Sequence, residues 1–380
     1  MSLGRRVYLD HNATTPLDPR VLEEMLPFLR DDFGNPSSLH WFGQRARAAV
    51  EEARASVAAL VGAESAEIVF TASGSESDNM ALRGVAAKAR APRRGLVVGG
   101  LEHHAVLNTA RALREEGWPV EIVRVREDGI VDLEDLAVKL GAGSALVSLM
   151  LANNETGVLQ PVAEAARLAR KHGALVHCDA VQAGGKLPID VRTLDVDLLT
   201  LSAHKLCGPK GVGCLYVRRG TPMGALVRGG GQERNRRAGT ENVAGIVGFG
   251  VAAALAAEVL PAEAARLRRL RDRLEERLLA LPGARRNGGE PRLANTANVS
   301  FPGAEAEDLV MALDLEGIAV STGAACAAGG VEPSHVLRAM GLPPERVQSS
   351  LRLSLGRCTT ETDVDRAADV IAAVLGRVRA

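Results

Sequence analysis

Between residues 66 and 218 the chain alternates short apolar runs, rich in β-branched residues, with longer segments whose apolar positions recur at helical spacing. Amphipathic segments such as 162–172, which ends at Gly173, lie between several of these runs. Strands that are apolar on both faces and alternate with helices are typical of a mostly parallel sheet covered on both sides. The sequence therefore predicts an α/β fold with seven strands, at 67–70, 95–98, 120–125, 145–149, 174–178, 198–201 and 213–217.

A second group of elements follows residue 241. An Ala- and Leu-rich helical region runs to about residue 281 and is expected to be interrupted at Pro261. Beyond it the pattern predicts a strand at 296–300, a helix at 305–316, strands at 318–321 and 351–355, and a terminal helix. We expect a large domain formed by residues 15–255 and a smaller α+β domain formed by residues 1–14 and 256–380.

The composition excludes several classes of protein. With 380 residues, of which 46% are hydrophobic and 24% charged, the chain is long enough for two domains and too apolar to be disordered. Its 46 basic and 46 acidic residues balance, so the net charge indicates neither a direct nucleic-acid partner nor a membrane surface. The uncharged stretch 243–257 is too short to cross a bilayer and there is no secretory signal, so a cytoplasmic location is expected.

Two titratable residues come directly after strands of the predicted sheet, where ligands of such sheets bind. Asp179 follows the strand at 174–178, and Lys205, one of only six lysines, follows the strand at 198–201. A lysine can hold pyridoxal 5′-phosphate (PLP) as a Schiff base while a carboxylate keeps the pyridine nitrogen protonated. The alternative is that both are ordinary surface residues at strand ends.

The segment Ser73-Gly74-Ser75-Glu76-Ser77 follows the first strand and opens a helical pattern. Its backbone N–H groups and hydroxyls would converge where the helix dipole favours an anion such as a phosphate. The alternative is a plain N-terminal capping box of Ser73 and Glu76, which is compatible with phosphate binding. Motifs for dinucleotides or a P-loop have no support in the chain.

Six motifs together make the chain resemble one enzyme family over residues 7 to about 360. They are Tyr8-Leu9-Asp10-His11-Asn12-Ala13-Thr14-Thr15-Pro16, Gly34-Asn35-Pro36-Ser37-Ser38 with His40, Glu102-His103-His104-Ala105-Val106-Leu107, Asn153-Asn154-Glu155-Thr156-Gly157, Ser202-Ala203-His204-Lys205 and Arg237-Ala238-Gly239-Thr240. In order and spacing they resemble the NifS/IscS-like cysteine desulfurases. These are class-V PLP enzymes of fold type I.

The resemblance implies roles for individual residues. Lys205 would be joined covalently to PLP, Asp179 would pair with the pyridine nitrogen, and His103 would stack on the ring and take part in catalysis. The other cofactor contacts that it implies come from Gly74, Ser75, Ser202 and His204 at the phosphate, Asn154 and Gln182 on the ring-hydroxyl side, and Thr240 of a second subunit. The resemblance therefore also implies a homodimer.

Arg352 is the candidate for binding the substrate carboxylate. Alternation along 350–355 places it on the face opposite three leucines, and a guanidinium there needs a carboxylate partner. In the resembled family the matching arginine binds the α-carboxylate of the amino acid, and Asn154 also contacts the substrate. The alternative is an internal ion pair. No metal is expected, because the paired histidines lack companions at ligand spacing.

Five cysteines, too irregularly spaced for a disulfide scaffold, are expected to be reduced. Cys326 differs from the others because it lies in a run of small residues with glycines on both sides, where a loop can move. Cys178 and Cys214 lie in predicted strands, Cys207 lies in a tight turn and Cys358 lies at a strand end. The residues before Cys326 are less rich in serine than is usual in the family.

The sequence therefore predicts a PLP-dependent cysteine desulfurase that converts L-cysteine to L-alanine and carries the sulfur as a persulfide on Cys326. The resemblance implies that an iron–sulfur scaffold protein or a tRNA-thiolation carrier accepts this sulfur. Two alternatives stay open. Another class-V enzyme, an aminotransferase or a selenocysteine lyase, would not need Cys326. A non-catalytic sulfur-trafficking protein on the same fold would bind no PLP and would be colourless.

Overall fold

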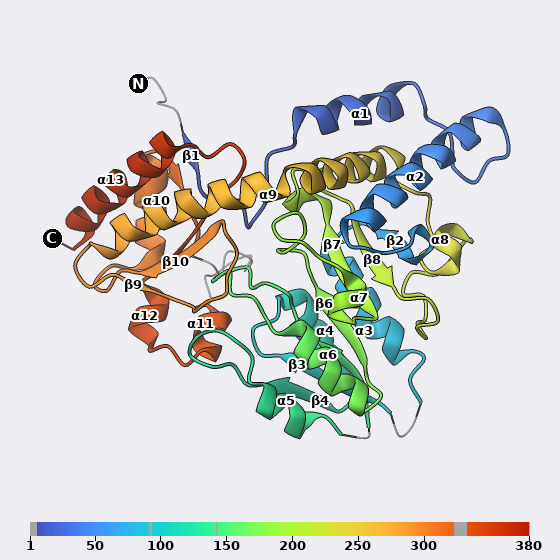
Figure 1. Cartoon of the computed structure of the whole chain (residues 1–380), viewed down its shortest axis with the longest axis horizontal. Coiled ribbons are helices and arrows are strands. Elements are labelled where there is room, and N and C mark those ends of the chain that lie inside the picture. Colours follow the sequence, from blue (N-terminus) through green and yellow to red (C-terminus); the bar gives the residue numbers. More distant parts are fainter. Residues whose placement is uncertain (1–5, 91–92, 142, 323–332, 380) are drawn as a thin grey trace.

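The computed structural model describes residues 6–90, 93–141, 143–322 and 333–379, and its largest sheet has seven strands (Figure 1). The strand order is β2-β8-β7-β6-β5-β3-β4. The strands are β2 (Ile68–Thr71), β3 (Gly95–Gly99), β4 (Val120–Val123), β5 (Ser144–Ser148), β6 (Leu175–Asp179), β7 (Leu198–Ser202) and β8 (Gly213–Val217). The strands β7, β6, β5, β3 and β4 run parallel to one another, whereas β8 runs antiparallel to both of its neighbours, β2 and β7. The predicted α/β fold and its seven strands are confirmed, each bound to within two residues.

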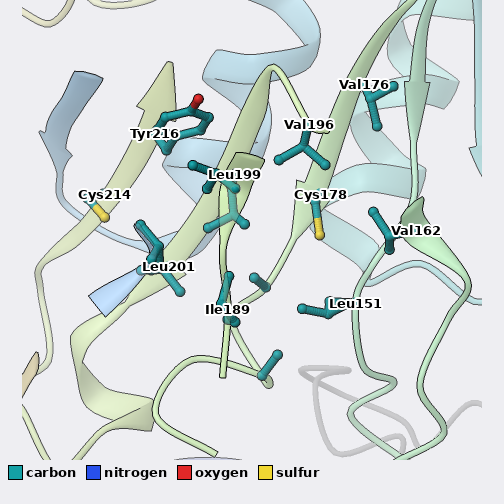
Figure 2. Packing of buried hydrophobic residues seen from close by; sticks show 14 of the residues in the cluster. Leu151, Val162, Val176, Cys178, Ile189, Val196, Leu199, Leu201, Cys214 and Tyr216 are labelled. Carbon is teal, nitrogen blue, oxygen red and sulfur yellow. The ribbon is translucent and has the colours of Figure 1, made fainter. Parts of the chain in front are cut away.

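Helices cover both faces of this sheet because neighbouring residues of each strand point to opposite faces. Leu199 packs into a core with α2, α6 and the first half of α9, whereas Leu198 packs into a core with α3 and α4. Figure 2 shows Cys178 and Leu199 among the aliphatic side chains of the first of these cores. The helical elements up to residue 279 are α1 (Pro19–Arg30), α2 (Trp41–Leu60), η1 (Ser65–Glu67), α3 (Gly74–Ala86), α4 (His104–Glu115), α5 (Leu133–Lys139), α6 (Val162–Lys171), α7 (Val191–Leu194), η2 (Ala203–Lys205), α8 (Gln232–Asn235) and α9 (Val243–Leu279).

The helix α9 links the two halves of the molecule (Figure 1). The expected interruption at Pro261 is wrong, because α9 continues through it. Pro261 lacks an N–H group, so the helix loses one hydrogen bond there, but packing on both sides of that turn holds the helix together. Within the described ranges α9 alone is long and apolar enough to cross a membrane, and it packs against α1, α2 and α13 instead.

The C-terminal elements form a separate hydrophobic core with the second half of α9. They are β9 (Arg285–Arg286), β10 (Thr296–Ser300), α10 (Ala306–Leu315), β11 (Ile318–Ala319), α11 (His335–Ala339), α12 (Pro344–Gln348), β12 (Ser350–Ser354) and α13 (Glu361–Val378). The strands β12, β10 and β9 form one sheet, and β1 (Val7–Tyr8) pairs with β11. The N-terminal residues thus join the C-terminal group. The domain boundary between residues 255 and 256 stays a prediction.

Candidate active site

A cavity of about 230 Å³ opens where β6 and β7 end. Nine of the ten predicted cofactor residues line it, namely Gly74, Ser75, His103, Asn154, Asp179, Gln182, Ser202, His204 and Lys205. Six further residues that we did not predict complete the wall: Ala13, Ser73, Asp78, Met150, Ala152 and Val181. A larger cavity of about 560 Å³, beside α2 and α8, contains none of the predicted residues.

One end of the cavity is the N-terminus of α3. Ser73 caps this helix, because its hydroxyl accepts the Glu76 N–H at 3.1 Å. The N–H groups of Gly74 and Ser75, in the first turn, have no acceptor within the helix and carry its positive dipole end. A Cβ on Gly74 would lie 2.8 Å from Val181 Cγ2, so any larger residue here would force a neighbour to shift. This end of the cavity is therefore built to receive an anion.

Asp179, the last residue of β6, lines the same cavity. Its carboxylate accepts the Val181 N–H at 2.9 Å. Burial raises the pKa of Asp179 to about 6, although the Val181 N–H and the charge of Lys205 both oppose this shift. A carboxylate held in so apolar a place favours a cationic N–H partner, which would return its pKa toward the ordinary value.

A second carboxyl group, Asp78 on α3, lines the same cavity beside Asp179. Burial and then the charge of Asp179 raise the pKa of Asp78 well above its ordinary value. Its Oδ1 lies 3.5 Å from Nε2 of His177, and burial lowers the pKa of that histidine to about 3. Burial therefore favours the neutral form of Asp78 beside Asp179.

Lys205 belongs to the short helix η2, directly after β7. Its Nζ donates to the backbone carbonyls of Asn12 and, at 2.8 Å, of Ala13. The neighbouring Thr14 hydroxyl lies 3.1 Å from His204 Nδ1. This N-terminal segment carries one of the family motifs, and the sequence predicted no separate role for it. In the structure its backbone holds the Lys205 amine.

His103 is the N-cap of α4, and its Nδ1 accepts the Ala105 N–H at 3.1 Å. Burial, followed by the charge of Lys205, lowers the pKa of His103 to about 4. The ring is therefore neutral at pH 7. Because Nδ1 is an acceptor here, the single ring proton must be on Nε2. Burial likewise lowers the pKa of His204 to about 4, so His204 is neutral as well.

Arg352, on β12, lies next to the cavity rather than in its wall. One of its Nη atoms contacts Asp10 Oδ1 at 2.6 Å and the other donates to the Asn154 carbonyl at 3.3 Å. The ion pair that we considered as the alternative is thus present. The Nε N–H is buried and has no acceptor among the described residues, so one edge of the guanidinium can still bind a carboxylate.

Two predicted residues lie elsewhere. Thr240 is exposed and does not line this cavity of its own chain, so its contribution to a second subunit stays a prediction. Cys326 falls outside the described residues. Of the described cysteines, Cys178 and Cys214 are buried as expected and Cys358 is exposed. Across the described ranges no cluster of three acidic, His or Cys side chains could hold a metal ion.

Comparison with known proteins covers nearly the whole chain. Residues 7–367 match the family model described as aminotransferase class-V. A cysteine desulfurase from Nostoc sp. is 48% identical over 378 residues, which are 98% of this chain and 94% of that protein. The solved structure of a NifS-like protein superposes with a TM-score of 0.93 at 42% identity, covering 98% of this chain and 100% of that one. The structure of SspA in complex with cysteine superposes with a TM-score of 0.82 at 36% identity, covering 92% and 98%.

Proposed function

The chain belongs to the class-V aminotransferase family, among its cysteine desulfurases, and we propose that it takes sulfur from L-cysteine with PLP on Lys205 and a persulfide on Cys326. The observation that carries this proposal is one cavity that joins a lysine amine, a buried carboxylate and a helix N-terminus. The alternatives, a lysine on the protein surface and a plain N-terminal helix cap, do not explain why these three groups meet in one cavity.

The residues of the cavity fit PLP. The unpaired N–H groups of Gly74 and Ser75, with the Ser202 hydroxyl, would hold the phosphate, and the missing Cβ of Gly74 leaves the room for it. A neutral His204 adds a polar group without adding charge. Asp179 would accept the pyridine N–H, and a stable cation at that place would relieve the cost of burying its carboxylate.

When bound, PLP supplies a ring that withdraws electrons from the amino acid and weakens its Cα–H bond. Arg352 would orient the substrate by binding its α-carboxylate through the free Nε edge. Lys205, released when the substrate amine replaces it, would take the α-proton on Nζ. Neutral His103 would lie against the ring, with its Nε2 proton available for transfer.

Cys326 would complete the reaction as a thiolate. Its sulfur forms a bond with the substrate sulfur while the bond between that sulfur and Cβ breaks. The bonding electron pair stays on Cβ, which then takes up a proton, so the products are alanine and an enzyme persulfide. No external oxidant is needed, because the carbon is reduced as the two sulfurs are joined.

The assembly and the cellular partners belong to the same proposal. A homodimer would bring Thr240 of one subunit to the phosphate end of the other subunit's cavity. The sulfur would pass to an acceptor protein, either an iron–sulfur scaffold or a tRNA-thiolation carrier, and we place the protein in the cytoplasm. Gel filtration tests the dimer, since an active monomer would contradict it.

Two labelling experiments test the proposed function. Borohydride reduction of the purified protein should leave a phosphopyridoxyl group on Lys205, and Lys205→Ala should abolish it while Lys171→Ala, at an exposed lysine, should not. After turnover of L-cysteine, mass spectrometry should find one added sulfur on Cys326.

The variant Cys326→Ala should lose sulfide production in the presence of a reductant, whereas Cys358→Ser, at an exposed cysteine, should keep it. Sulfide production that survives Cys326→Ala would favour another class-V enzyme. A colourless protein without a reducible adduct would favour the non-catalytic alternative.

A further inference from the structure

A second amine, Lys186, lies close to the cavity and has no part in the reaction proposed above. Its Nζ donates to two oxygens of one residue, the backbone carbonyl of Gln182 at 3.0 Å and the side-chain Oε1 at 2.9 Å. Gln182 itself is buried and lines the cavity. The double contact ties the amine to a side chain that lines the cavity.

This contact decides which end of the Gln182 amide faces which neighbour. An amine with hydrogens aimed at an oxygen must donate, so Oε1 is the atom beside Lys186. Nε2 then lies on the other side, where it donates one N–H to the Asn12 carbonyl at 2.9 Å. An amide nitrogen has two hydrogens, so a second N–H is left for the cavity.

We propose that Lys186 is a positioning residue that fixes the amide of Gln182 so that an N–H, and not the carbonyl oxygen, faces the ligand. The inference rests on the proposed function, because the ligand atom concerned would be the ring oxygen of PLP. An N–H donor stabilises that oxygen when it is anionic, whereas a reversed amide would place two oxygens against each other.

The charges around Lys186 do not undo this arrangement near neutral pH. Burial, followed by the charge of Lys205, lowers the pKa of Lys186 to about 7, with Arg352 acting in the same direction and Cys207 in the opposite one. The charge of Lys186 in turn contributes to the lowered pKa of His11. A deprotonated amine keeps two N–H groups, which is the number that the Gln182 contacts use. The amide of Gln182 therefore keeps its orientation whether Lys186 is protonated or neutral.

A double-mutant cycle on the holoenzyme tests the proposal. The variants are Lys186→Met, Gln182→Ala and the double variant, and the readout is the pH midpoint of the visible absorbance of bound PLP. Lys186→Met should raise the midpoint by about one unit, because a charge-assisted hydrogen bond to the ring oxygen is lost. In the Gln182→Ala background the same change should cause a clearly smaller shift, because only the through-space effect of the lost charge remains.

Loss of the Lys186 charge shifts the midpoint through space in both backgrounds, whereas loss of the contact with Gln182 has an effect only where Gln182 is present. The cycle therefore separates the effect of the charge from the effect of the contact. Equal shifts in both backgrounds, or no shift in either, would overturn the positioning role. Lys186→Arg, which keeps charge and donors, should restore most of the wild-type midpoint. If Lys186→Met does not fold, Lys186→Ala removes the same contact. A wild-type protein without a visible band would instead overturn the proposed function, and the ligand named here with it.

Discussion

A buried ion pair between α2 and α8 should be essential to the stability of the protein. The guanidinium of Arg54 binds the carboxylate of Glu233 through two bonds of 2.7 and 2.8 Å, and the two side chains are only 4% and 3% exposed. Glu233 also accepts the Phe70 N–H at 2.9 Å, and Arg54 lies over the Phe70 ring. The pair thus joins α2, β2 and the segment that leads to Thr240.

The change Arg54→Met keeps most of the apolar stem and removes the charge. Removing one partner of a buried pair typically costs about 3–5 kcal/mol, because the other charge is left buried. Three consecutive residues, Glu233, Arg234 and Asn235, have φ of 45°, 56° and 62°, a left-handed backbone that costs about 1 kcal/mol or more for each. Relaxation of this segment in Arg54→Met would release some of that backbone strain and offset part of the destabilisation. We therefore expect the free energy of unfolding to fall by about 3 kcal/mol.

Urea unfolding at one fixed protein concentration measures this loss, since the unfolding of an oligomer depends on concentration. The matched control is Arg273→Met, which breaks a pair with Asp365 in which the two side chains are 51% and 34% exposed. That surface pair should contribute no more than about 1 kcal/mol. The double variant Arg54→Met with Glu233→Met should recover much of the loss. Equal effects of Arg54→Met and Arg273→Met would refute the reasoning.

Three further predictions concern the cavity. Gly74→Ala should weaken PLP binding about tenfold in an absorbance titration, because its Cβ would overlap Val181, and unchanged affinity would contradict the close fit. The pKa of Asp179 in the folded protein, about 6, is higher than in the unfolded chain, so the wild-type protein loses stability as the pH rises through that range. Asparagine does not titrate. In thermal unfolding of the cofactor-free protein, the melting temperature of Asp179→Asn relative to wild type should therefore rise between about pH 4 and 7. Asp78→Asn should change the free energy of unfolding by less than about 1 kcal/mol in urea, because burial favours the neutral form of this carboxyl; a loss like that of a broken ion pair with His177 would show that it is ionised.

Much of the fold follows from local patterns. Most strands of the large sheet are buried, largely apolar runs, so their positions could be predicted to within two residues; β4 is the exception, with two exposed central residues. The antiparallel direction of β8 could not, because strand direction depends on the partners in the sheet and not on the run itself. The expectation that Pro261 would interrupt α9 was wrong. Packing of the helix on both sides of Pro261 outweighs the low helix propensity of proline.

The side chains of the site were easier to predict than its backbone. Nine predicted residues line one cavity because motifs record side chains at the ends of strands and helices. The groups that hold Lys205, by contrast, are the carbonyls of Asn12 and Ala13, which every residue type possesses. Asp78 was also missed, since an acid in the first turns of a helix is usually a surface residue, and only the packing of α3 buries it.

The N-terminal segment connects Arg352, the proposed substrate-binding residue, with the amine of Lys205. The Asn154 carbonyl accepts both Arg352 Nη1 and Asn12 Nδ2, the latter at 3.1 Å, and the Asn12 carbonyl accepts Lys205 Nζ. The C-terminal group fixes Asn12, because the Thr296 hydroxyl accepts its amide at 2.9 Å. A carboxylate that draws Arg352 away from Asn154 therefore changes the hydrogen bonding of the residue that holds the amine. The proposed binding of substrate at Arg352 and the proposed release of Lys205 thus share one contiguous set of contacts, which spans both halves of the molecule.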